Sequence, residues 1–380
     1  MSGVLTTIFR ILSYLGLGCL IVVPVRAAEY VVTPSVTVQE TYDDNLFFYD
    51  MEDFECLVSA DIELTARTER IYVSGSAGCD ISEYRRHNEL DGVDHAYEIS
   101  AHALSSATSR LGISGRYIRD HTTDALEESG DVVERCERTR ASVQPSAAIE
   151  LDPRNRIEGS CSLSEARYEL DRYTNHTAES LNVTWVHDLA NERTSILFQI
   201  GGNLTDYETD LRQRTCLGLV GIDHRFTEDL KIELNGGGRY TKSKSPGGYE
   251  ENTGFSGSLG LTWRFEKSAL LVNISEEFTP SMYGEDMIRD RASISLRHRL
   301  SEKLNCGLIT SYYKNRTEGI VRTREYETFS VRPSVNYRFG EYLHLQLGYS
   351  YTATGNEITS HSKERNRIYV QISSEWPLHP

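Results

Sequence analysis

The segment that decides the fold is Leu230–Tyr240, which reads Leu-Lys-Ile-Glu-Leu-Asn-Gly-Gly-Gly-Arg-Tyr. Its even-numbered positions are apolar, aromatic or glycine, and its odd-numbered positions are charged or polar apart from a single glycine. Successive side chains of a strand point to opposite faces, so the segment predicts a strand with one apolar and one polar face. The same alternation returns in Phe255–Phe265, Phe329–Phe339 and Leu343–Tyr351.

Short polar connectors separate such segments, and longer, more polar connectors fall between them. The short ones lie at Ala66–Glu69, Ser105–Ser109, Asp152–Asn155, Ala190–Glu192, Thr227–Asp229, Glu266–Ser268, Ser301–Lys303 and Gly340–Glu341. Alternating short turns and long loops are typical of a transmembrane β-barrel. Counting gives about eighteen strands, an even number that leaves both chain ends on the short-turn side. The predicted fold class is all-β: a closed antiparallel transmembrane β-barrel with short periplasmic turns and longer extracellular loops.

Seven of the eight short turns are preceded by a triplet in which a charged residue stands between two larger aliphatic or aromatic-ring residues. The triplets are Ile62-Glu63-Leu64, Ile149-Glu150-Leu151, His187-Asp188-Leu189, His224-Arg225-Phe226, Trp263-Arg264-Phe265, His298-Arg299-Leu300 and Tyr337-Arg338-Phe339. We expect the outer pair at the lipid interface, where aromatic rings are favoured, and the charge in a wet lumen. The alternative is a soluble β-solenoid or sandwich with one polar face.

Backbone chemistry favours the barrel. An unpaired N–H or C=O group in lipid costs several kcal/mol, so a sheet there must close on itself. In a small soluble barrel the inner face would be an apolar core, but the polar set here is rich in Ser, Thr, Asn, Gln, Arg and Glu, which cannot pack dry without a large desolvation cost. The apolar face is therefore predicted to be the outside.

Composition narrows the function. The chain has 380 residues, 40 Lys+Arg against 56 Asp+Glu, a formal net charge of -16 and a mean hydropathy of -0.44. A helical membrane protein needs repeated apolar stretches of roughly 20 residues, and only one apolar run occurs, at the start. The acidic balance argues against nucleic acid as a partner, because phosphate neutralisation needs a basic face.

The first residues have the features of a secretory signal. Arg10 supplies the positive region, an apolar stretch follows, and Val25-Arg26-Ala27 offers a small-residue cleavage site. A membrane anchor and a lipoprotein signal at Cys19 are the alternatives. We expect residues 1–28 to be a signal peptide and 29–380 to be a single barrel domain in the outer membrane, in contact with its lipid and lipopolysaccharide.

The predicted lumen carries charge of opposite sign on its two halves. The acidic wall comprises Glu55, Asp61, Glu63, Asp80, Glu150 and Glu158. The basic wall comprises Lys231, Arg239, Arg264, Arg297, Arg299, Arg332, Arg338 and Arg367. Opposed walls of this kind produce a transverse field that orients dipolar solutes and sets ion selectivity. The alternative is that these charges pair with one another and merely hold the wall.

Six cysteines remain after the signal, and an even number in an exported chain is compatible with disulfides. Cys56 and Cys79 flank the first short turn symmetrically and are expected to face each other across neighbouring strands. A disulfide between them is one interpretation, and two small apolar residues in lipid is the other. No metal site is predicted, because there is no C-x-x-C motif and the other cysteines fall on separate strands.

Two chain ends carry a resemblance. The opening strand Val32–Val38 leads into Tyr-Asp-Asp-Asn-Leu-Phe-Phe at 42–48, and the final strand Arg367–Ile372 ends near Trp376. The mature chain resembles the outer-membrane β-barrel porins of Gram-negative bacteria, including those associated with exopolysaccharide and exosortase systems. The resemblance implies an outer-membrane channel, folded by the barrel assembly machinery, with no catalytic residue and no cofactor.

Two functions stay open at this point. One is a channel that passes small solutes, or an exported polysaccharide, through a polar lumen. The other is a structural or surface-interaction barrel whose lumen is closed by inward loops. An enzyme is not expected, because the motifs H-E-x-x-H, G-x-x-x-x-G-K and G-x-S-x-G are all missing from the sequence.

Overall fold

The computed structural model describes residues 29–125, 134–209, 211–245, 248–284, 286–317, 325–356 and 361–378. The signal peptide predicted for residues 1–28 lies outside the described residues. Eighteen strands make up most of the described chain, with three short 3-10 helices, η1 (Leu46–Phe48), η2 (Asn88–Leu90) and η3 (Thr122–Ala125). No helix in this part of the chain is long and apolar enough to cross a membrane.

The strand bounds are β1 (Glu29–Asp43), β2 (Asp53–Arg67), β3 (Ile71–Tyr84), β4 (Gly92–Leu104), β5 (Ser109–His121), β6 (Glu137–Asp152), β7 (Asn155–Tyr168), β8 (His176–Asp188), β9 (Thr194–Tyr207), β10 (Arg212–Arg225), β11 (Leu230–Ser245), β12 (Gly248–Arg264), β13 (Ser268–Pro280), β14 (Asp286–Arg299), β15 (Leu304–Thr317), β16 (Glu325–Arg338), β17 (Leu343–Asn356) and β18 (His361–Glu375).

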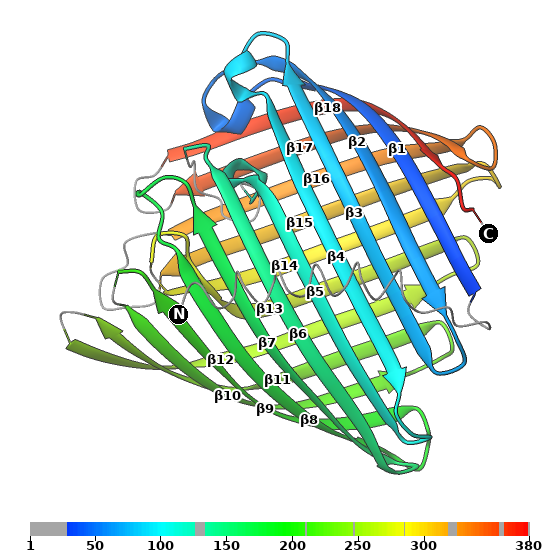
Figure 1. Ribbon diagram of the computed structural model, residues 1–380, viewed down its shortest axis with the longest axis vertical. Coiled ribbons are helices and arrows are strands. Elements are labelled where there is room, and N and C mark those ends of the chain that lie inside the picture. Colours follow the sequence, from blue (N-terminus) through cyan, green and yellow to red (C-terminus); the bar gives the residue numbers. More distant parts are fainter. Residues whose placement is uncertain are drawn as a thin grey trace.

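Each strand pairs antiparallel with the next, and β1 also pairs with β18, so the sheet closes (Figure 1). The closing ladder runs from Ser35 opposite Glu375 to Asp43 opposite Arg367. Closure gives every strand two neighbours, which satisfies backbone groups that water cannot reach in a bilayer. The predicted fold class, a closed antiparallel barrel, is confirmed.

The short connectors lie where the sequence predicts them, with one exception. β4 ends at Leu104 and β5 begins at Ser109, for example, in agreement with the second predicted turn. The first turn lies later than expected, because β2 continues to Arg67 and β3 begins only at Ile71. β1 begins and β18 ends at the short-turn end, as the even strand count requires.

The outer face of the barrel is apolar. Side chains that a soluble protein would bury are strongly exposed there, including Leu181 at 58%, Ile200 at 68% and Ile368 at 57%. Taking a side chain of this size out of water is worth about 1.5–3 kcal/mol, so this face is stable against hydrocarbon rather than water. One closed sheet with its aliphatic residues outside excludes the soluble sandwich.

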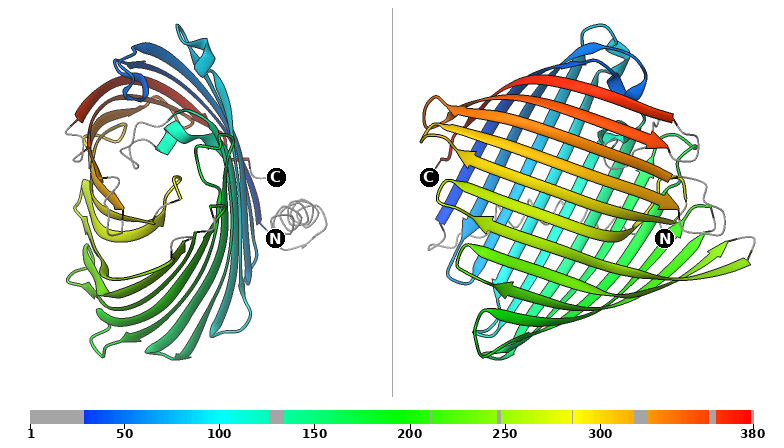
Figure 2. Two further views of the ribbon diagram at one scale, coloured as in Figure 1. Left: turned by 90° about the vertical axis from the view of Figure 1, so that its left-hand side faces the viewer. Right: turned by 180° about the vertical axis from the view of Figure 1, so that it is seen from behind.

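Aromatic rings gather on the outer face near the short turns. The ring centroids of Trp263 and Phe265 are 4.1 Å apart, and those of Tyr337 and Phe339 are 4.8 Å apart. These are outer members of the predicted triplets, and they form part of an interfacial girdle. Seen from the long-loop end, the barrel is oval, and some loops fold into the opening (Figure 2).

Candidate channel lumen and mouth

The inner face of the barrel is polar because every second residue of each strand points inward. The acidic residues singled out from the sequence lie there: Glu55, Asp61 and Glu63 on β2, Asp80 on β3, Glu150 on β6 and Glu158 on β7. The basic residues lie on later strands: Lys231 and Arg239 on β11, Arg264 on β12, Arg297 and Arg299 on β14, Arg332 and Arg338 on β16, and Arg367 on β18. The wall of β1–β5 faces the wall of β13–β17 across the lumen (Figure 2).

Some of these charges are paired within their own wall. Lys231 lies 2.9 Å from Asp223 and 2.5 Å from Glu233. Glu158 and Glu150 have arginine partners on their own or the adjacent strand, Arg156 at 2.7 Å and Arg110 at 3.6 Å. Such ion pairs link neighbouring side chains of the wall, and because their charges cancel they contribute little to the electric field in the lumen.

Other charges have no ion-pair partner among the described residues. This holds for Asp61, Glu63 and Asp80 on one wall and for Arg264, Arg297 and Arg299 on the other. Glu55 and Arg338 also have no ion-pair partner among the described residues, so the sign separation between the walls rests mainly on these eight residues. Their charges can act on a solute in the lumen, because neighbouring side chains do not neutralise them.

A cluster of apolar and aromatic side chains lies at the long-loop end. It contains Leu46, Phe47 and Phe48 of η1, with Tyr84, Cys136 and Tyr173, all less than 9% exposed. Partly buried residues pack against it: Met51, Leu90, Tyr168, Leu170, Met282 and Tyr283. We call this set the mouth cluster. Because its members come from the first, second, third, fourth and seventh long loops or the strand ends beside them, it draws those loops together over the lumen.

Two buried ion pairs anchor the mouth cluster to the wall. Arg365 of β18 contacts Asp43 of β1 at 2.5 Å, with side chains 8% and 2% exposed. The Arg365 guanidinium also lies over the rings of Phe47 and Phe48, 5.6 and 6.0 Å from their centroids. A buried charge without a partner costs several kcal/mol, so this pair fixes η1 in place.

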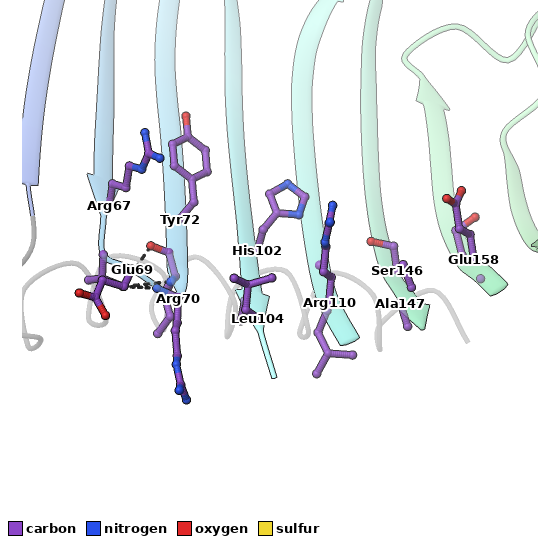
Figure 3. A pocket seen from close by; sticks show the side chains of 18 of the residues that line it. Arg67, Glu69, Arg70, Tyr72, His102, Leu104, Arg110, Ser146, Ala147 and Glu158 are labelled. Atoms are coloured by element: carbon purple, nitrogen blue, oxygen red, sulfur yellow. Dashed lines mark hydrogen bonds between the residues drawn. The ribbon is translucent and has the colours of Figure 1, made fainter. Parts of the chain in front are cut away.

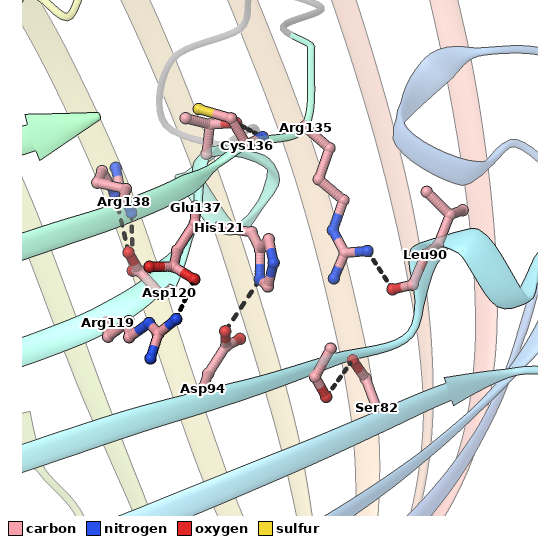
Figure 4. A network of polar contacts seen from close by, with 12 residues as sticks. Ser82, Leu90, Asp94, Arg119, Asp120, His121, Arg135, Cys136, Glu137 and Arg138 are labelled. Atoms are coloured by element: carbon pink, nitrogen blue, oxygen red, sulfur yellow. Dashed lines mark hydrogen bonds and ion pairs between the residues drawn. The ribbon is translucent and has the colours of Figure 1, made fainter. Parts of the chain in front are cut away.

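The second pair lies on β5 and β6, where Arg138 donates two hydrogen bonds to Asp120, at 2.8 and 2.9 Å (Figure 4). Nearby, His121 contacts Asp94 at 2.9 Å and Arg135 donates to the carbonyl of Leu90. This polar network holds the second and third loops against each other. Burial in the mouth cluster raises the pKa of Tyr173 to about 12, and its hydroxyl donates to the Glu134 carbonyl at 2.9 Å.

The hairpin of β13 and β14 leans across the lumen. The Thr174 N–H donates to the Met282 carbonyl at 2.7 Å, and the rings of Tyr173 and Tyr283 lie 5.7 Å apart. Gly284 has φ +72°, a conformation that favours glycine, and it sits against Thr174. The tip of this hairpin is therefore attached to the loop between β7 and β8, far from its own strand neighbours.

A cavity of about 580 Å³ lies at the short-turn end along β2–β8. Figure 3 shows Arg67, Tyr72, His102, Arg110 and Glu158 along it. Gly112 lies between His102 and Ser146, and a Cβ atom there would meet both side chains at 2.8 and 2.6 Å. The cavity is a recess of the lumen wall at the periplasmic end.

The predicted facing of Cys56 and Cys79 is wrong. Cys56 lies opposite Glu83, and Cys79 lies opposite Ala60, so the two cysteines are offset along the ladder. Both are free thiols on the outer face. The error follows from the late first turn, which moves the centre of the hairpin and shifts the register. These residues serve as small side chains toward lipid.

Sequence reasoning did not find the mouth cluster. Its signal was present in Leu46-Phe47-Phe48, an apolar run inside an otherwise polar loop. An apolar run in a loop that water surrounds is unfavourable, so it indicates a loop that folds back on the protein. Within the part of the chain that the structure describes, no group of three His, Cys, Asp or Glu side chains is placed to hold a metal ion.

No protein-family model matches this chain, and no curated protein matches it at a significant level. Solved structures are similar in fold. The crystal structure of Pseudomonas aeruginosa OccK2 (OpdF) gives a TM-score of 0.52 at 10% identity, covering 92% of this chain and 98% of that chain. The FrpB iron transporter from Neisseria meningitidis, in an apoprotein form, gives 0.51 at 8% identity, covering 90% of this chain and 81% of that chain.

At these identities the likeness concerns the fold alone. The class that the closed sheet, the apolar exterior and the polar interior define is the outer-membrane β-barrel of porin type. The finer resemblance to exopolysaccharide- and exosortase-associated porins rests on the two chain ends alone.

Proposed function

We propose that this protein is an outer-membrane channel through which small hydrophilic solutes diffuse passively. The observation that carries the proposal is the closed sheet of eighteen strands with an apolar exterior and a continuous polar interior. Barrels of about 16–18 strands are wide enough to enclose an aqueous channel. No catalytic step and no cofactor is part of the proposal.

Selection would come from size and from the field between the walls. Asp61, Glu63 and Asp80 face the side of the lumen that carries Arg297 and Arg299, and none of these five is paired among the described residues. A solute that carries separated positive and negative groups gains by aligning with this field. Charged rings of this kind also set ion selectivity in wide pores.

The mouth cluster supports small solutes rather than an exported polysaccharide. A polymer moving along the axis would have to pass the loops that the mouth cluster joins, including the contact between Tyr173 and Tyr283. The polymer-exclusion limit of the channel, measured with polymers of graded size, tests whether a polysaccharide can pass. A limit below the width of one sugar chain would rule it out.

Contact with lipopolysaccharide is part of the proposal. Above the apolar belt, the outer face carries ion pairs such as Lys314 with Glu327 at 2.8 Å and Arg316 with Asp290 at 2.9 Å. Charged groups at this level suit the sugar and phosphate layer of the outer leaflet. The barrel assembly machinery would recognise the final strand, β18.

The direct test is single-channel recording of residues 29–380 refolded into a planar bilayer. A heat-dependent shift in gel mobility serves as the folding control. Steady currents proportional to voltage support the channel. A correctly folded protein that carries no current favours the second candidate, a barrel closed by its loops with a role in surface interaction, which the mouth cluster also supports.

A further inference from the structure

Four basic side chains gather on the outer face of β10 and β11 at the long-loop end. Arg212 lies opposite Lys244 in the ladder of these strands, and Arg214 lies opposite Lys242. All four share the outer face with Val220, which is 54% exposed, because residues of a strand that are an even number apart point to the same side. The hairpin of β11 and β12 reaches past the neighbouring strands at this end (Figure 2). We call the four residues the basic patch.

The basic patch carries repulsion within the sheet. Each of its residues lies directly opposite another of like charge, and such pairs destabilise neighbouring strands. Two of the four have an acidic partner: Arg212 donates to Asp206 at 2.9 Å, and Lys242 lies 2.7 Å from Glu251. These ion pairs are exposed and therefore contribute little to stability. An anion bound on the patch would relieve the repulsion that remains.

The other two residues of the patch, Arg214 and Lys244, have no ion-pair partner among the described residues. The second neighbour of Arg214 is Leu204 on β9, and that of Lys244 is Tyr249 on β12. Glu179 lies one strand beyond Leu204, on β8. Acidic residues outnumber basic ones in the chain by 56 to 40, so these two uncompensated cations do not follow from composition.

The basic patch lies at the outer edge of the apolar belt. Ten residues of β10 separate Arg214 from His224, whose ring contacts Phe226 at the short-turn end, 4.4 Å between centroids. At about 3.3 Å per residue and a strand tilt of about 40°, Arg214 and His224 are about 25 Å apart along the membrane normal, the height of the apolar band in outer-membrane barrels. Arg214 therefore lies where the acyl chains of the outer leaflet end and the phosphate groups of lipopolysaccharide begin.

An exposed tyrosine borders the patch. The Tyr249 side chain is 67% exposed, and its ring centroid lies 5.1 Å from the Lys242 Nζ and 6.0 Å from the Lys244 Nζ. An ammonium group is attracted to the face of an aromatic ring, so the ring keeps both lysines close together. A tyrosine also suits the boundary between acyl chains and headgroups, because it has an apolar body and a polar tip.

The strands beneath the patch are packed on their inner side. Gln213, Thr215 and Thr241 are 1%, 4% and 1% exposed, and the hydroxyls of Thr215 and Thr241 lie 3.2 Å apart. The backbone that carries the patch is therefore fixed, and a ligand orders little besides the basic side chains. Preorganisation of this kind lowers the entropic cost of binding.

We propose that the basic patch binds the phosphate groups of lipopolysaccharide in the outer leaflet. The apolar belt beside the patch contacts the acyl chains of the same molecule, so one lipid finds its complement at both levels. The planar guanidinium of Arg214 can donate to two phosphate oxygens at once. This inference rests on the lipopolysaccharide contact proposed above and names its site, and it does not depend on whether the lumen conducts.

The test measures binding of lipid A, the phosphorylated anchor of lipopolysaccharide, to residues 29–380 refolded in neutral detergent. Native mass spectrometry gives the affinity, and gel mobility checks folding. Arg214→Gln with Lys244→Gln should lower the affinity about tenfold or more, since each basic group near an anionic lipid surface adds to binding. Lipid A without its phosphates should bind the parent protein as weakly as lipid A binds this variant.

The matched control is Lys314→Gln on β15. Lys314 also lies on the outer face, but it is 3.2 Å from Glu325 and 2.8 Å from Glu327, so its charge is already neutralised. Its loss should change the affinity for lipid A by less than about twofold, because an exposed paired charge contributes little.

Stability separates binding from a structural role. Without lipid A, the double variant should be at least as stable as the parent protein, because it removes one charge from each pair of opposed like charges. With lipid A, the unfolding midpoint should rise for the parent and for the Lys314→Gln control, and much less for the double variant.

Three results would overturn the proposal, each in a different way. Equal affinity of the parent and the double variant would remove the site but not the wider contact with lipopolysaccharide. A parent protein that does not bind lipid A would remove both. Phosphatidylglycerol that binds the patch as tightly as lipid A would show a general attraction for anionic lipid. The channel function is tested separately, by conductance.

Discussion

We call the junction between two neighbouring strands a seam. Two seams of the barrel differ in the contacts that hold them beyond the ends of their hydrogen-bond ladders. The seam of β1 and β18 is reinforced at both ends, by the buried pair of Asp43 and Arg365 at the mouth and by residues after β18 at the periplasmic end. The ladder of β12 and β13 stops at Gly257 opposite Glu276, and beyond it the Ser256 hydroxyl donates to the Glu276 carbonyl and Arg239 stacks on Phe278.

The difference indicates that each seam is held by its own local contacts. The chain ends meet at one seam, which must stay shut for the barrel to exist. The other seam joins two strands that a turn already connects, so it can open at one end without unfolding the sheet. Substitutions at the first seam should therefore reduce stability more than those at the second.

The largest effect is expected from Asp43→Ala. The substitution leaves Arg365 buried without its partner, and such losses cost about 3–5 kcal/mol. Urea unfolding of the protein in lipid vesicles, followed by tryptophan fluorescence, measures the change. Removing both charges in Asp43→Asn with Arg365→Met should be milder than the single substitution. Equal destabilisation by both variants would show that the pair does not hold this seam.

A chain ending at Glu375 tests the periplasmic end of the same seam. It lacks the hydrogen bond from the Trp376 N–H to the Pro34 carbonyl and both bonds between Val32 and Leu378, at 3.0 and 2.7 Å. The expected loss is about 2 kcal/mol, because each exposed backbone hydrogen bond contributes about 1 kcal/mol or less. The same unfolding assay, started from refolded protein, separates this effect from any effect on assembly in cells.

Phe278→Leu is the matched change at the β12–β13 seam. It keeps an apolar side chain but removes the ring under Arg239, so stability should fall by only about 0.5–1 kcal/mol. A stability loss as large as that of Asp43→Ala would erase the contrast between the seams.

The smallest effect concerns pH and the first loop. The hydrogen bond and ion pair with Arg86, at 2.7 Å, hold the pKa of Glu52 below its ordinary value of 4.5. Because the folded-state pKa is depressed, the contribution is present above pH 4.5 and is lost as the pH falls through the lower folded value. Protease cleavage in residues 44–52 should increase in that acidic range, and Glu52→Gln should make cleavage independent of pH there. Identical acid profiles for the two proteins would exclude this role of Glu52.

The sequence predicted the wall well because the wall follows a local rule. In Leu230–Tyr240, each side chain faces lipid or lumen according to its position in a period of two, and the turns before Leu230 and after Arg264 lie as expected. The period of two does not determine the register between two neighbouring strands, which depends on where the turn between them lies. The prediction that Cys56 and Cys79 lie opposite each other was wrong because the turn between their strands lies later than the sequence composition indicated.

The mouth could not be predicted because its contacts join loops far apart in the chain. Nothing near Met282 in the sequence indicates that its carbonyl accepts from Thr174, and nothing near Gly257 indicates that the ladder with β13 stops there. Both follow from where the loops meet in space. The unpaired charges at Asp61 and Arg297 were found from their positions, but which of the wall charges are paired required the structure.

The apolar face of the sheet meets lipid in this structure, and Cys161 allows the most direct test of that orientation. Its neighbour Ser160 lies on the inner face of β7, opposite Asn182, while Cys161 lies opposite Leu181 on the outer face. A fluorophore on Cys161 as the sole cysteine should be quenched by spin-labelled lipid and not by aqueous iodide. The same fluorophore in Ser160→Cys with Cys161→Ser should be quenched by iodide and not by the lipid. The reverse pattern would contradict the account, because the polar face would then lie against hydrocarbon.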